Sequence, residues 1–222
     1  MDYKKKYLKY KVKYLQAKQK FKGGSTLPGE SQKAMVEQVT QKYHSIAEEV
    51  ADLNSGVDRA SLREGVDVGL YSDTTPPQVI GNLYWNNLGI EKLPPNFFEN
   101  LAVVRDLDLS NNDLASVPAF GTLKVEGNLD LSHNELSSLK LPPEFKVGRM
   151  LSLDNNKLSE LPKEFGSITV ESDLHLHNNK LASLPKGFSN LTVKGMLDLR
   201  NNNLDPKPDP RIFEKVKGTT FV

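Results

Sequence analysis

An internal repeat of 22–24 residues constrains the fold of this 222-residue chain more than any other feature of its sequence. Six segments align without gaps: VIGNLYWNNLGIEKLP from residue 79, VVRDLDLSNNDLASVP from 103, VEGNLDLSHNELSSLK from 125, VGRMLSLDNNKLSELP from 147, VESDLHLHNNKLASLP from 170 and VKGMLDLRNNNLDPKP from 193. The first leucine of each segment stands at 83, 107, 129, 151, 174 and 197. Units of this length bury their apolar side only against their neighbours, so residues 79–222 are expected to form a solenoid.

Each segment has two features that predict its local structure. The pattern V-x-G-x-L-x-L alternates with a period of two, which predicts one short strand with its leucines facing inward. An asparagine follows the strand at the same place in five segments: Asn112, Asn134, Asn156, Asn179 and Asn202. Their side chains are expected to bond the backbone where the chain turns out of the strand, as a structural ladder. The asparagine before it, such as Asn155, is expected to contribute little.

Phenylalanines follow the strands at a regular place and predict an aromatic spine inside the solenoid. Six of the nine phenylalanines belong to this set: Phe97, Phe120, Phe145, Phe165, Phe188 and Phe213. They are interpreted as core residues and not as a cofactor site.

Both ends of the repeat region depart from the pattern, as capping units do. Trp85 replaces a leucine in the first repeat, and Leu88 stands where the asparagine is expected. The last residues, VKGTTFV, predict a seventh strand after a short helix that begins near Asp209. Upstream, one helical stripe predicts a cap over residues 31–78 or, alternatively, a free-standing coiled-coil helix. The stripe consists of Val36, Val39, Tyr43, Ile46, Val50 and Leu53.

The pattern LxLxxNxLxxLP over residues 79–222 resembles that of the leucine-rich repeat family. The resemblance implies an α/β solenoid of short parallel strands whose concave strand face binds a protein or peptide. The predicted binding residues on that face are Tyr84, Asp108, Asp130, Ser152, His175 and Asp198, with Asp154, His177 and Arg200 beside them. This face is polar and acidic, so a basic or mixed partner is expected.

One group of residues on that face allows a different interpretation. Asp173, His175 and His177 alternate along one strand, with Asp154 and Asp198 one strand away on either side. Such a group can bind a divalent metal or transfer protons, which leaves a metal-dependent hydrolase as an alternative function. We interpret these residues as ordinary polar surface residues, because an open strand face excludes little water. We therefore expect no enzyme activity, metal or cofactor.

The first 24 residues differ from the rest of the chain. Residues 1–22 hold nine lysines and one acidic residue, for a net charge of +8, whereas the remainder has a net charge of −7. Three heptads within residues 3–23 predict a basic amphipathic helix that docks on a protein surface, or on nucleic acid. Its docking face consists of Tyr3, Tyr7, Leu8, Tyr10, Tyr14 and Leu15. Gly23 and Gly24 end this helix or mark a cleavage site, and residues 25–30 form a linker.

The run YLKYKVKYL followed by Gly-Gly resembles an N-terminal module found on proteins of giant DNA viruses of the mimivirus type. The resemblance implies a viral protein in host cytoplasm, in the virus factory or in the virion. A structural virion protein is thus a second alternative, and a solubilising basic arm is a third interpretation of the segment. The chain has no cysteine, which favours a reducing compartment, and no apolar run long enough to span a membrane.

Overall fold

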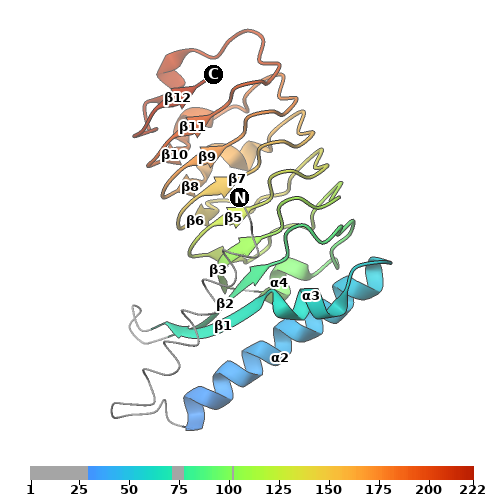
Figure 1. Ribbon diagram of the computed structural model, residues 1–222. Coiled ribbons are helices and arrows are strands. Elements are labelled where there is room, and N and C mark those ends of the chain that lie inside the picture. Colours follow the sequence, from blue (N-terminus) through green and yellow to red (C-terminus); the bar gives the residue numbers. More distant parts are fainter. Residues whose placement is uncertain (1–29, 72–77, 102) are drawn as a thin grey trace.

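The computed structural model describes residues 30–71, 78–101 and 103–222, and Figure 1 shows them as turns stacked upward from a long helix. The predicted docking segment, residues 1–24, lies outside the described residues. Within the described part of the chain, twelve strands form one sheet. The sheet is parallel apart from its first strand pair, and helices are few. The observed fold is therefore an α/β arrangement of solenoid type.

Each repeat in the middle of the stack contributes two strands of two residues. The first strands are β4 (Lys124–Val125), β6 (Lys146–Val147), β8 (Thr169–Val170) and β10 (Thr192–Val193). The second strands are β5 (Leu129–Asp130), β7 (Leu151–Ser152), β9 (Leu174–His175), β11 (Leu197–Asp198) and β12 (Thr220–Phe221). Equivalent strands of neighbouring repeats pair in parallel, so two ladders run along the solenoid. The longer strand β3 (Val103–Asp108) pairs with β4 through one end and with β5 through the other.

The prediction of one strand per repeat is confirmed for the first two repeats, of which β3 belongs to the second, but it was wrong from β4 onward, because there the chain bends inside the V-x-G-x-L-x-L pattern. Gly127 lies at one such bend, and its amide donates to the Arg105 carbonyl of the preceding repeat over 2.7 Å. A Cβ atom at Gly127 would lie 2.6 Å from that carbonyl oxygen, which is too close for a side chain. Neighbouring turns thus approach closely at this corner, and the period-two alternation alone gives no sign of the bend.

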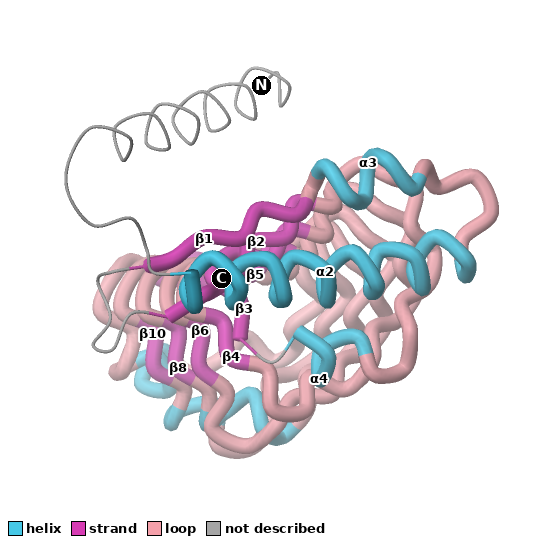
Figure 2. The backbone as a smooth tube through the Cα atoms, turned by 90° about the horizontal axis from the view of Figure 1, so that it is seen from below, coloured by secondary structure: helices cyan, strands magenta, loops and turns pink. Residues whose placement is uncertain are grey.

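The amino-terminal part combines helices with an antiparallel strand pair. It contains α2 (Glu30–Leu53), α3 (Arg59–Glu64), β1 (Val66–Tyr71) and β2 (Gln78–Tyr84). Strand β1 was not predicted; it pairs antiparallel with β2, which in turn pairs in parallel with β3. Figure 2 shows α2 lying across the lower end of the stack, where it contacts β1 and β2.

Packing of α2 against the first repeat depends on one tyrosine and one glycine. Tyr43 is buried, and its hydroxyl donates to the Val103 carbonyl over 3.0 Å. A Cβ atom at Gly81 would lie 2.0 Å from Cε2 of Tyr43, so only glycine leaves room for this ring. Leu53, the last member of the predicted apolar stripe, is 46% exposed and does not join the core.

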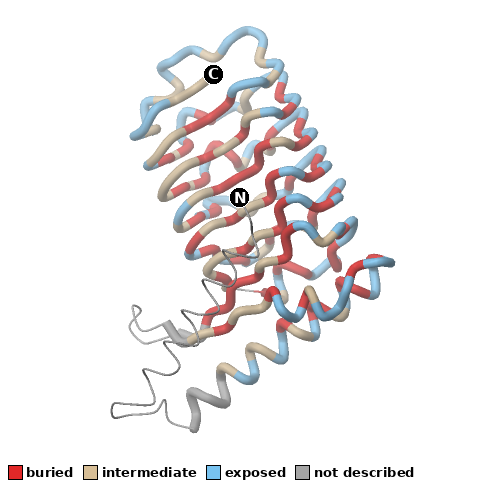
Figure 3. Tube along the Cα trace, viewed as in Figure 1, coloured by how far each residue is buried: buried red, intermediate tan, exposed pale blue. Residues whose placement is uncertain are grey.

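Across the whole stack, Figure 3 shows that buried residues recur at the same place in successive turns.

Aromatic rings line the inside of the solenoid. Short helices hold most of them: α4 (Phe97–Leu101), η2 (Lys163–Ser167), η3 (Phe188–Asn190) and η4 (Pro210–Phe213). Phe98, which the sequence analysis did not select, stacks on Phe120 with ring centroids 4.3 Å apart. At the far end Phe213 contacts Phe188 at 6.2 Å but stays half-exposed. The helix expected after Asp209 is the short 3-10 turn η4.

Candidate binding face

One row of side chains crosses the second strands of successive repeats. The strand register makes each member the direct Cα partner of the next along the row Tyr84, Asp108, Asp130, Ser152, His175 and Asp198. This strand-face row contains the six central residues that the sequence analysis selected. One side chain per repeat therefore faces the same side of the sheet.

Each row residue from β3 onward interacts with the side chain two positions later. Asp108 Oδ1 accepts from the Ser110 amide at 3.0 Å and from its hydroxyl at 2.6 Å. Asp130 and Ser132 repeat this arrangement with the same two distances. These bonds hold the two carboxylates in fixed orientations on the face.

Negative charges lie close together near β5. Burial raises the pKa of the Asp130 carboxyl above its ordinary value, against hydrogen bonds from Ser132 that lower it. The carboxylates of Asp108 and Asp154 raise this pKa further. Ionised Asp130 is thus disfavoured mainly by burial and, to a smaller degree, by repulsion from these two carboxylates, which a bound cation would relieve.

Three of the predicted binding residues are buried and so cannot form a contact surface. Ser152, Asp154 and Asp198 belong to this group; Asp154 is 7% and Asp198 2% exposed. The Arg200 guanidinium donates to both carboxylate oxygens of Asp198, at 2.9 and 2.6 Å, and lowers the pKa of that carboxyl. Arg200 also lies over the Phe221 ring, 4.7 Å from its centroid. The accessible part of the face is therefore Tyr84, Asp108, Asp130, His175, His177 and Arg200.

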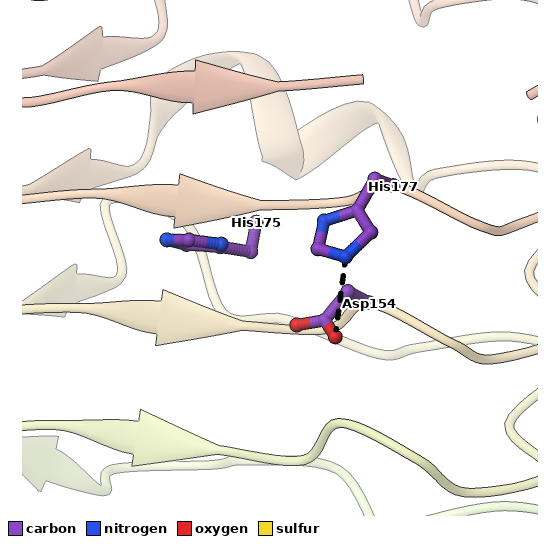
Figure 4. A group of neighbouring side chains, drawn as sticks. All are labelled: Asp154, His175 and His177. Carbon is purple, nitrogen blue, oxygen red and sulfur yellow. Dashed lines mark ion pairs between the residues drawn. The ribbon is translucent and has the colours of Figure 1, made fainter. Parts of the chain in front are cut away.

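Two histidines and Asp154 meet where β7 and β9 lie side by side, as Figure 4 shows. One possible ligand atom from each of Asp154, His175 and His177 lies within 4.8 Å of the others. His177 Nε2 is 3.6 Å from Asp154 Oδ2, and His177 Nδ1 is 3.5 Å from Asp198 Oδ2. Asp173 is not part of this group, because its Oδ1 accepts from the Met196 amide at 2.7 Å.

The five inner asparagines bond the backbone of two repeats each. Asn156 is representative: its Nδ2 donates to the carbonyls of Leu131 and Leu153, at 3.0 and 3.1 Å. Its Oδ1 accepts from the amide of Leu136 in the preceding repeat at 3.0 Å. The same bonds recur at Asn112, Asn134, Asn179 and Asn202. Each asparagine therefore fastens its own repeat to the one before it.

In the first repeat Leu88 replaces this asparagine. No earlier repeat precedes Leu88, so an asparagine there would have no neighbouring repeat to bond, and α2 contacts that side of the molecule instead. The buried Asn54, at the end of α2, accepts from the amides of Glu91 and Lys92, both at 2.8 Å. It donates to the carbonyls of Val50 and Lys92. Asn54 thus adds to the first repeat a second set of side-chain bonds, beside those that it receives from Asn112 of the next repeat.

Sequence reasoning missed a second side-chain ladder on the sheet. Asn82 Oδ1 accepts from the Asp106 amide at 3.0 Å, and Asp106 Oδ1 accepts from the Asn128 amide at 2.7 Å. Asn128 and Asp173 bond the next repeat in the same way. The signal was a recurring Asn or Asp immediately before the first leucine. These residues link repeats and leave less of the face to a partner.

Comparison of this chain with protein-family models gives no match, and comparison with curated proteins gives none either. Among the described residues, no helix combines the length and the apolar character needed to cross a membrane.

Proposed function

We propose that this chain is a non-enzymatic scaffold of the leucine-rich repeat class whose strand-face row binds a protein partner with basic side chains. Support for the class comes from the repeat length of 22–24 residues and from the buried leucines of each repeat. The inner asparagines add further support, because one side chain per repeat bonds the backbone of its neighbour. Such stacking creates a long face with one side chain per repeat, which suits an extended contact surface.

The raised pKa of Asp130 carries the choice of a basic partner. Burial raises the pKa of Asp130 most, and the neighbouring carboxylates of Asp108 and Asp154 raise it further. A lysine or arginine from a partner would be attracted to this position and would lower the cost of that charge. At the other end of the row, Arg200 already neutralises Asp198. The basic partner is therefore expected over β3 and β5, next to β2, where Tyr84 offers an aromatic ring to a cation.

In this proposal, residues 1–24 provide a second attachment point. The segment lies outside the described residues, so its role depends on its net charge of +8 and on its resemblance to the module of giant-virus proteins. It would dock the scaffold on another protein in the host cytoplasm, virus factory or virion.

A peptide-binding experiment tests the acidic face directly. Fluorescence anisotropy of a labelled eight-lysine peptide is measured against the full chain, with a chelator present and with an eight-glutamate peptide for comparison. The double variant Asp108→Asn/Asp130→Asn is expected to bind the lysine peptide about tenfold more weakly, equivalent to about 1.4 kcal/mol. Binding of the wild-type chain should also weaken as salt is added.

The matched control removes two acidic charges away from the row. Asp113 and Glu160 are both exposed and follow their strands in the turns of two repeats. Asp113→Asn/Glu160→Gln should bind the lysine peptide like the wild type. Equal losses in both double variants would show attraction by net charge alone and would contradict the proposed face.

A further inference from the structure

We propose that Asp154, His175 and His177 form a binding site for a divalent first-row transition-metal ion, with Zn²⁺ as its simplest occupant. Two imidazoles and one carboxylate are a donor set that suits such ions. Their possible ligand atoms lie within 4.8 Å of one another. A tetrahedral ion with bonds of about 2.0–2.1 Å needs its donors about 3.3 Å apart. Closing the group on an ion thus requires shifts of about 1.5 Å, within reach of side-chain rotation.

A local inversion of the repeat pattern brings the carboxylate to the histidines. In the two preceding repeats the paired side chains run Asp108–Ser110 and Asp130–Ser132, whereas the next repeat has Ser152 first and Asp154 second. The hydrogen bond is kept, because the Ser152 hydroxyl donates to Asp154 Oδ1 at 2.7 Å. The inversion moves the acid two residues along the chain, where its Oδ2 lies 3.6 Å from His177 Nε2.

The surroundings of His177 resemble the outer shell of a metal-bound histidine. Its Nδ1 is buried, has no hydrogen-bond partner among the described residues, and lies 3.5 Å from Asp198 Oδ2. A small ring rotation would let Nδ1–H donate to that carboxylate and leave Nε2 free for the ion. Histidine ligands commonly make such a bond, which fixes the tautomer and makes the ligand nitrogen more basic.

Asp198 is itself held in place. It is 2% exposed and accepts two hydrogen bonds from the Arg200 guanidinium, at 2.9 and 2.6 Å. Arg200 to Asp198 to His177 is thus a chain of contacts that ends at the proposed ligand. The three protein donors leave at least one coordination position for water or for a donor group of a bound molecule.

Calorimetric titration of the full chain with ZnCl₂, after chelator treatment, tests the site. The wild type should bind one ion with a saturable isotherm. His177→Gln, His175→Gln and Asp154→Asn should each weaken binding about 100-fold or abolish it, and Asp198→Asn should weaken it about 10- to 100-fold. His44→Gln and Asp113→Asn are matched controls and should bind like the wild type, because His44 lies on α2 and Asp113 lies in an exposed turn of another repeat.

A second measurement uses only the wild-type chain and so does not depend on the folding of a variant. Paramagnetic Co²⁺ should broaden the imidazole NMR signals of His175 and His177 at one equivalent and leave those of His44 sharp. The proposal is overturned if the wild type shows no saturable binding, or if His175→Gln/His177→Gln binds Zn²⁺ as tightly as the wild type.

Discussion

The two ends of the solenoid are closed in different ways. At the amino-terminal end Trp85 is 0% exposed, and its indole N–H donates to the Leu62 carbonyl at the end of α3 over 2.7 Å. At the carboxyl-terminal end Phe213 and Phe221 stay half-exposed. Strand β12 is held by backbone bonds such as that from the Leu199 amide to the Phe221 carbonyl, at 2.7 Å.

This difference shows what the substitutions in the first repeat achieve. A leucine at position 85 would fill space, but it could not bond the end of α3 as tryptophan does. Asn54 and Tyr43 add side-chain bonds from α2 to the first repeat and to β3. The amino-terminal end is therefore joined by buried polar contacts, and unfolding is expected to begin at the carboxyl-terminal end.

The largest expected loss of stability comes from a comparison of one aromatic residue at each end of the solenoid. Trp85→Ala should lower the free energy of unfolding by about 3–5 kcal/mol, because it leaves a buried cavity and an unpaired Leu62 carbonyl. Phe213→Ala should cost only about 1–2 kcal/mol, because that ring is already partly hydrated. Urea denaturation followed by circular dichroism measures both values. Equal losses would mean that the two ends are closed equally well.

The second effect compares the asparagines nearest each end. Asn54→Ala should cost about 1–3 kcal/mol, because the partly buried amides of Glu91 and Lys92 lose their acceptor. Asn202→Ala should cost less, about 0.5–1.5 kcal/mol, since Asn202 is partly exposed and water can replace its bonds. The urea concentration at the midpoint of unfolding, measured for both variants, shows which substitution costs more stability. A larger loss at Asn202 would place the more stable junction at the carboxyl-terminal end.

A third effect, in the middle of the stack, gives a reference for both ends and corrects an expectation. Asn155 was expected to contribute little, but it has a positive φ of 54° and bonds Asp154 and Asn178. Asn155→Ala should cost about 1 kcal/mol through its left-handed backbone. Asn155→Gly keeps that conformation accessible and should cost less in the same unfolding assay. If both variants match the wild type, the positive φ adds no constraint.

The smallest expected effect is a gain in stability at the centre. Because the folded-state pKa of Asp130 is raised, the folded chain binds this proton more tightly than the unfolded chain. Ionisation of Asp130 therefore costs stability as the pH rises from the unfolded pKa through the folded one. Asp130→Asn should stabilise the chain at pH 7 by a few tenths to about 1 kcal/mol. Thermal melts should show the gain shrinking as the pH falls through the folded pKa and vanishing below about pH 4, the ordinary Asp value.

Much of the stacking could be predicted from the sequence, because the repeat is visible in the spacing of its leucines. The structural role of asparagines such as Asn156 could be predicted from the same repeat alignment, because they recur at one position in five of the six repeats. The period of two did not reveal the bend at Gly127, since bends depend on how closely neighbouring turns approach. Strand β1 was missed because its pairing with β2 joins segments separated by residues 72–77.

The candidate site was only partly predictable for a similar reason. Strand alternation placed Asp108, Asp130 and His175 in one row, but it could not show that Asp154 and Asp198 are buried. Burial there results from the neighbouring side chains of His177 and Arg200, which the pattern treats as independent positions. Asp173 was misassigned because a carboxylate that bonds the backbone of the next repeat looks, in sequence, like one that faces a ligand.

The direction of the asparagine bonds bears on how such a chain can lengthen. Each unit brings the amide side chain that its predecessor needs, as Asn156 does for Leu136. An in-frame duplication of one unit of 22 or 23 residues would therefore supply both new junctions at once, with no compensating change elsewhere. The unit that follows α2 differs, because there the preceding residue Asn54 supplies the amide side chain, which accepts from the amides of Glu91 and Lys92. The number of repeats can thus change by duplication along the stack. The junction between Asn54 and the first repeat has to be kept, because its bonds are not repeated elsewhere.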